Sequence, residues 1–141
     1  MNNIKLQGFI AYFGLIPALT VVIDAYFIET ISQSVIRNFM LYYSIIIFTF
    51  IGAMIWQLKP TGSITRTLYG TIPSLISFLL IVMNLIGYDY QVIATTLMVS
   101  LLLQCFCDRF IYYENRALED FYIYVRIPVT LTLVFFIFIV I

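Results

Sequence analysis

Five long apolar stretches follow one another along the chain, each long enough to cross a lipid bilayer. A transmembrane helix needs about 20 consecutive, mostly apolar residues. Soluble domains carry about 25% charged residues, whereas here 63% of residues are hydrophobic and only 10% are charged. The sequence therefore predicts an all-α membrane protein, a single domain forming one bundle of about five transmembrane helices. The predicted spans cover residues 6–28, 39–58, 67–86, 91–107 and 121–141.

The positions of lysine and arginine predict the orientation of this bundle. With five spans, six of the seven cations fall on one side of the membrane: Lys5, Lys59, Arg66, Arg109, Arg116 and Arg126. Only Arg37 falls on the other side. Because cytoplasmic loops collect lysine and arginine, we expect the N-terminus inside and the C-terminus outside. Trp56 then lies at the inner interface, where an indole ring is favoured.

Polar residues recur at helical spacing in the third and fourth predicted spans. The third span carries Gly70, Thr71, Ser74, Ser77 and Asn84, and the fourth carries Thr96, Ser100, Gln104 and Asp108. Small and hydroxyl residues let helices approach closely in lipid. Since a short hairpin joins these two spans, we expect the two stripes to face each other as a packing seam. The alternative is a hydrated path for an ion or a small solute.

Charged groups at membrane depth are costly and are candidates for function. Asp24 lies about one turn from the outer end of the first span and is expected to reach the interface unaided. Arg126 is the one charge of the last span, and its long side chain can reach towards the inner surface. We predict that Arg126 pairs with Asp108 and links the last two helices. Binding of an anionic substrate by Arg126 is the alternative.

The sequence offers no familiar catalytic, cofactor or metal-binding constellation. Histidine is absent, which removes the commonest haem and catalytic zinc ligands. Cys105 and Cys107 lie two residues apart and point to nearly opposite sides of a helix. No phosphate-binding glycine motif and no basic patch for nucleic acid occurs. We expect that the protein is not an enzyme and that it binds no cofactor, metal or nucleic acid. A lipid-modifying enzyme that uses the carboxylates of the fourth loop is a further alternative.

Four ordered stretches resemble the transmembrane protein 69-like family, also described as domain of unknown function 3429. They are residues 8–17 (GFIAYFGLIP), Tyr43 with residues 50–56 (FIGAMIW), residues 72–78 (IPSLISF), and Asp108 with residues 121–130 (FYIYVRIPVT). Two departures are visible. Ile55 stands where members carry a histidine before the tryptophan, and Phe121 and Tyr124 stand where members tend to have a tryptophan. The resemblance implies a small five-helix protein of bacterial or mitochondrial inner membranes and implies no activity.

These observations favour a non-enzymatic accessory or assembly subunit of a membrane complex, for which a respiratory complex is a conceivable host. The alternative is a small oligomeric transporter or channel that uses Asp24, Gln104, Asp108 and Arg126. We expect the lipid bilayer and helices of other proteins as partners, as a homo-oligomer or within a larger complex. The bacterial inner (plasma) membrane is the expected location, and the mitochondrial inner membrane is the alternative.

Overall fold

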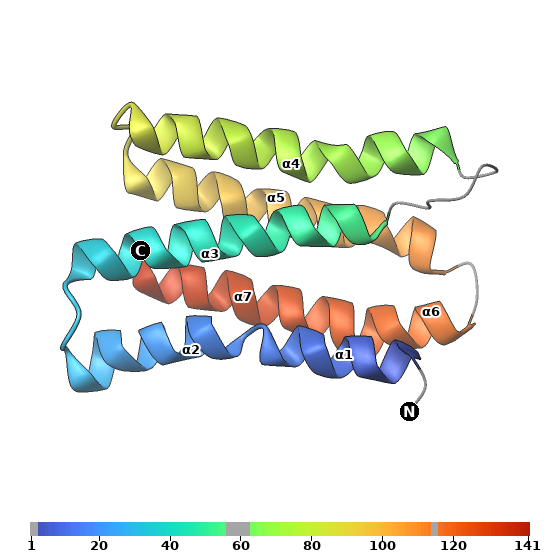
Figure 1. The fold of residues 1–141 in the computed structure, drawn as a ribbon, viewed down its shortest axis with the longest axis horizontal. Coiled ribbons are helices and arrows are strands. Elements are labelled where there is room, and N and C mark those ends of the chain that lie inside the picture. The colour runs from blue at the N-terminus through green and yellow to red at the C-terminus, as the bar shows by residue number, and fades with distance from the viewer. Residues whose placement is uncertain (1–2, 56–62, 114–115) are drawn as a thin grey trace.

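A computed structural model describes residues 3–55, 63–113 and 116–141 of the chain. Within these ranges five helices are long and apolar enough to cross a membrane, which confirms the predicted class and number of spans. They lie side by side along the long axis of the bundle, with the two chain ends at opposite ends (Figure 1). The spans are Lys5–Ile28, Gln33–Met54, Ile64–Leu85, Tyr90–Ile111 and Arg116–Val140.

The three middle spans are continuous helices, whereas the first and last spans are composite. The middle helices are α3 (Gln33–Met54), α4 (Ile64–Leu85) and α5 (Tyr90–Tyr112). The first span joins α1 (Asn3–Phe13), α2 (Ile16–Ile23) and a π-helical turn, η1 (Asp24–Ile28). The last span joins α6 (Arg116–Phe121), a second π-helical turn, η2 (Tyr122–Arg126), and α7 (Ile127–Val140).

Prolines lie beside both interruptions, and a tyrosine hydroxyl binds a backbone carbonyl near each of them. Pro128, at the start of α7, has no N–H to donate to the carbonyl of Tyr124 four residues earlier. The hydroxyl of Tyr12 on α1 donates to that carbonyl at 2.5 Å. Pro17 is the second residue of α2, and the carbonyl of Gly14 in the preceding break accepts from the hydroxyl of Tyr43 at 2.5 Å. Because lipid offers no hydrogen bonds, these contacts satisfy the backbone and tie neighbouring spans together.

The second span begins earlier than the sequence predicts. The sequence predicts that the second span begins at residue 39, but α3 starts at Gln33, directly after Ser32. Ile36 is buried, and the Arg37 guanidinium donates to the Ile141 carbonyl at 3.1 Å and lies 5.7 Å from the Tyr90 ring centre. The polar turns are therefore helical because they find partners at the end of the bundle.

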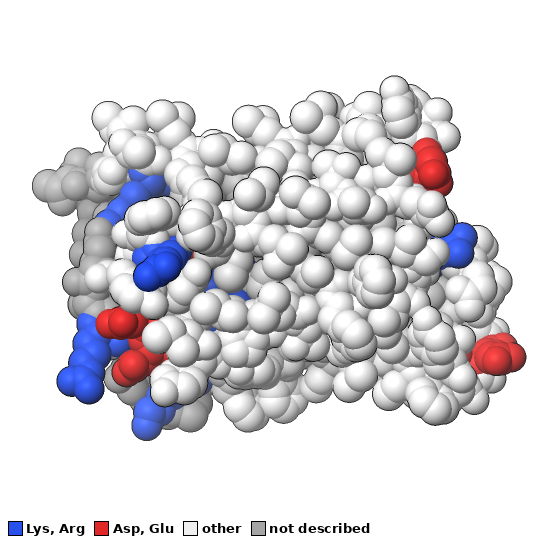
Figure 2. Space-filling view, turned by 180° about the vertical axis from the view of Figure 1, so that it is seen from behind, with Lys and Arg blue, Asp and Glu red and all other residues white. Residues whose placement is uncertain are grey.

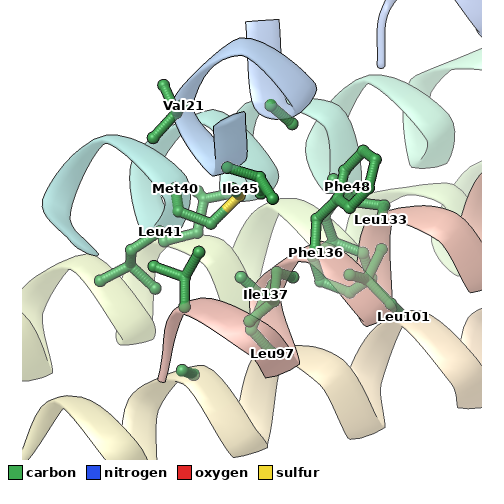
Figure 3. Packing of buried hydrophobic residues seen from close by; sticks show 14 of the residues in the cluster. Val21, Met40, Leu41, Ile45, Phe48, Leu97, Leu101, Leu133, Phe136 and Ile137 are labelled. Carbon is green, nitrogen blue, oxygen red and sulfur yellow. The ribbon is translucent and has the colours of Figure 1, made fainter. Parts of the chain in front are cut away.

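The hydrophobic core lies where α2, α3, α5 and α7 meet. Figure 3 shows side chains of these helices packed together, among them Met40, Phe48, Leu97 and Ile137. Since lipid is as apolar as these side chains, close packing rather than exclusion of water holds such helices together. α4 packs on α3 and α5 at the edge of this core.

α4 directs its small and polar stripe at α3, not at α5. A Cβ atom built on Gly52 of α3 would lie 2.7 Å from the Gly70 carbonyl oxygen, so the two backbones almost touch. Further along, Thr49 donates to Ser77 at 2.9 Å, and Asn84 donates to the Tyr42 hydroxyl at 2.8 Å. The prediction that the stripes of the third and fourth spans face each other is wrong. A short hairpin makes two helices neighbours but leaves their rotation open, and the glycine contact sets it.

The stripe predicted on α5 is divided between two environments. Gln104 and Asp108 are buried, whereas Thr96 is exposed and Ser100 is partly exposed. The Thr96 and Ser100 hydroxyls each donate at 2.8 Å to the carbonyl four residues earlier in their own helix. The outer half of this stripe therefore faces the surroundings of the bundle.

The surface of the bundle has the pattern of a protein immersed in lipid. On the face seen in Figure 2, charged side chains gather mainly at the two ends and a broad uncharged band lies between them. Large apolar side chains such as Leu75, Phe78 and Phe138 are exposed along the spanning helices. Contact with a lipid bilayer accounts for so much exposed apolar surface.

Candidate functional site

A buried ion pair joins α5 to the last span. The Nε atom of Arg126 donates to Oδ2 of Asp108 at 2.8 Å. Its Nη2 atom lies 2.7 Å from the same oxygen as an ion-pair contact, at an angle that does not make a second hydrogen bond. The side chain of Asp108 is 0% exposed and that of Arg126 is 5% exposed. The predicted contact between these two residues is present.

Two more side chains complete this group, which we call the Asp108 network (Tyr69, Asp108, Arg126 and Thr130). The Tyr69 hydroxyl of α4 donates to Oδ1 of Asp108 at 2.7 Å and also lies 3.2 Å from the Gln104 carbonyl oxygen. The Nη1 atom of Arg126 donates to the Thr130 hydroxyl at 2.7 Å. Both carboxylate oxygens of Asp108 are therefore occupied, and the network joins α4, α5, η2 and α7.

The local backbone explains why Arg126 points inward. Arg126 is the last residue of η2, where the N–H of Ile127 donates to the carbonyl of Tyr122 five residues earlier. A π-helical turn carries an extra residue and shifts the phase of the side chains that follow it. The same turn buries Tyr122, whose hydroxyl donates to the Cys105 carbonyl at 2.8 Å. Two polar side chains of η2 thus reach α5.

Sequence reasoning missed Tyr69 and Thr130. Thr130 could have been predicted from the sequence, because residues four apart share one face of a helix and Arg126 needs further hydrogen-bond acceptors. Tyr69 was harder to predict, since tyrosine is common near the membrane interface for reasons of solvation alone. Its contact depends on how α4 is rotated, which the spacing of residues does not fix.

Gln104 lies one turn before Asp108 and is the least satisfied polar side chain of the site. It is 6% exposed. Among the residues that the structure describes, neither its amide nitrogen nor its amide oxygen has a hydrogen-bond partner. A buried amide without partners is costly and normally signals a water molecule or another group. Gln104 therefore stays a candidate polar site beside the network.

Asp24 binds the connection that follows its own span. It is 6% exposed, and its carboxylate accepts from the backbone N–H of Ile31 at 2.9 Å and from the Thr30 hydroxyl. Both donors belong to the connection that leads from η1 to α3, so the carboxylate lies at this end of the first span. The side chain fixes the end of η1, far along the chain from the Asp108 network.

The other residues that the sequence singled out add little to the site. Trp56, expected at the inner interface, lies outside the described residues. Cys105 is buried and Cys107 is exposed, as expected for opposite sides of a helix. Across the described residues, no group of three or more histidine, cysteine or acidic side chains is placed to hold a metal ion.

Replacing Tyr69 with phenylalanine is expected to destabilise the protein by about 1 kcal/mol, because the hydroxyl bonds a buried carboxylate. Thermal or SDS-induced unfolding of the purified protein in detergent micelles measures the change. Tyr88, an exposed tyrosine of the hairpin, provides the matched Tyr88→Phe control and is expected to show little change. Equal stability of the Tyr69→Phe variant and the unaltered protein would show that Asp108 does not depend on this donor.

Comparisons with family models, with curated proteins and with solved structures find no match to this chain.

Proposed function

We propose that this protein is a non-enzymatic accessory or assembly subunit of a larger membrane complex, with a respiratory complex as one conceivable host. The observation that carries the proposal is the exposed hydroxyl face of α5. Thr95, Thr96 and Ser100 line a shallow groove there with Asp89 and Gln91, on the side of the helix turned away from the core. Small residues four apart allow a second helix to approach closely in lipid.

The arrangement of charges supports the same function. Asp108 and Arg126 neutralise each other inside the bundle and join three spans. An ion pair buried between spans stabilises the fold, and the outer surface of the bundle stays free for contacts with other helices. The resemblance to the transmembrane protein 69-like family is compatible with this proposal and adds no activity to it.

We further propose that the end of the bundle bearing Lys5, Arg66, Arg109 and Arg116 faces the cytoplasm or the mitochondrial matrix. Arg37 is at the opposite end, beside the last residue of the last span. The excess of cations at one end supports this orientation. A bacterial inner membrane is the proposed location and a mitochondrial inner membrane the alternative.

A bulky residue on the hydroxyl face of α5 is expected to release the protein from its complex. In mild detergent, the unaltered protein should migrate on a native gel within a larger assembly, whose members mass spectrometry identifies. The Ser100→Trp variant should migrate as the free protein, because the indole blocks close approach of a second helix. The control is Leu75→Trp, on an exposed face of α4, which should remain in the assembly.

Migration of the unaltered protein alone would contradict the proposal and favour a small transporter or channel. Gln104 supports that second candidate, because its buried amide lacks a partner among the described residues and lies one turn from Asp108. In proteoliposomes, transport through this region predicts solute flux that the Gln104→Leu variant abolishes. Absence of flux from the unaltered protein would exclude this route.

A further inference from the structure

A cavity of about 390 Å³ lies between α1, α3 and the last span, with Arg126 among the residues that line it. Ligand-binding pockets commonly measure about 300–1,000 Å³. Ile10 and Ala11 of α1, Ile47 and Phe50 of α3, and Val129 of α7 are among the residues that line it. Of the described lining residues, only Gln7 and Arg126 have polar side chains.

The cavity opens sideways, at the depth of the spanning helices. Three residues at its edge are well exposed: Ile10 (56%), Phe50 (61%) and Met54 (42%). All three belong to membrane-spanning segments, so the medium outside the opening is lipid. Water is a poor occupant, because a water molecule needs two to four polar partners and this lining is almost entirely apolar.

We infer that one acyl chain of an anionic membrane phospholipid occupies this cavity. An unfilled space would leave the lining side chains without dispersion contacts, and a hydrocarbon chain supplies them. The choice of head group follows from charge. The end of the bundle nearest Gln7 bears four described cations, Lys5, Arg66, Arg109 and Arg116, against two carboxylates, Glu119 and Asp120. The Asp108–Arg126 pair adds no net charge to this excess.

The lipid site is independent of the hydroxyl face of α5, so it goes beyond the proposed function. Cations at a membrane surface attract anionic head groups. A phospholipid held there has its head group near the exposed Gln7 amide and its chain between α1 and α3. The bound lipid thus completes the contact between the first, second and last spans.

Photolabelling tests this inference in phosphatidylcholine vesicles that contain the full protein. The probe is phosphatidylglycerol with a diazirine in one acyl chain, and digestion with mass spectrometry locates the label. We expect strong labelling of the α3 segment around Ile47 and Phe50, relative to the lipid-facing segment of α4 around Leu75 and Phe78. Unlabelled phosphatidylglycerol should reduce the labelling of α3 several-fold. The labelling of α4, measured relative to the labelling of bulk lipid, should not change.

Two matched variants locate the site. Ala11→Phe fills the cavity and should reduce the α3 label several-fold, whereas Ala53→Phe places the same ring on an exposed face of α3 outside it and should not. The competition on the unaltered protein decides the question if Ala11→Phe fails to fold. Equal labelling of α3 and α4, no competition, or crosslinks from α3 to a second polypeptide in place of lipid would each overturn the inference.

Discussion

Replacing Arg126 with glutamine, or Asp108 with asparagine, is expected to destabilise the folded protein by about 3–5 kcal/mol. Either change leaves the other member of the pair charged in a buried site, and the surviving charge no longer has its ionic partner. The two variants should therefore lose similar stability and similar folded yield. Unfolding by SDS in mixed micelles measures the stability, and the fraction recovered as a single peak in gel filtration measures the yield.

Exposed residues of the same types provide the controls. Arg109→Gln and Asp120→Asn remove the same charges from exposed positions at one end of the bundle and are expected to change stability by well under 1 kcal/mol. A double variant, Asp108→Leu with Arg126→Met, should recover most of the loss, because apolar residues of similar volume often replace a buried pair without cost. Full yield and unchanged unfolding of both single variants would refute the structural role of the pair.

Replacing Gly52 with alanine is expected to destabilise the contact between α3 and α4 by about 1–3 kcal/mol. The added methyl group would lie 2.7 Å from the Gly70 carbonyl oxygen and 2.8 Å from Cγ of Pro73. Neither atom is the end of a flexible side chain, so the two helices must move apart. The same unfolding measurement applies.

Two comparisons make this prediction specific to the helix contact. At Gly8, the added atom would lie 3.1 Å from a methyl group of Val125, which can rotate away, so Gly8→Ala should cost less. Ala53→Val adds volume at an exposed position next to Gly52 and should have little effect. If Gly52→Ala is no more destabilising than Gly8→Ala, the close backbone approach does not determine the packing of α4.

The number of spans was predictable because lipid demands long apolar helices whatever their neighbours are. Their ends and rotations were not. Gln33 begins a helix within a polar stretch because Arg37 finds a carbonyl and an aromatic ring at the end of the bundle. The rotation of α4 follows from the fit of Gly52 against Gly70, which involves two residues separated by a whole connection.

The candidate site was likewise predictable only in part. A lone arginine and an aspartate near the same predicted end of their spans were sufficient to predict the pair of Arg126 and Asp108. Tyr69 depends on the rotation of α4, and the π-helical turn that directs Arg126 inward has no simple signature in the sequence. Gln104 was predicted as a polar candidate, but only the packing shows that its amide is buried without a partner among the described residues.

The position of the ion pair along the chain also bears on how the protein is made. Asp108 and Arg126 are 18 residues apart, and the aspartate is synthesised first. At usual rates of translation, about 5–20 residues per second, the arginine follows roughly 1–4 s later. The countercharge of Asp108 therefore lies on a span that is synthesised after α5. An insertion intermediate that holds the first four described spans and lacks the span bearing Arg126 would leave Asp108 without its ionic partner.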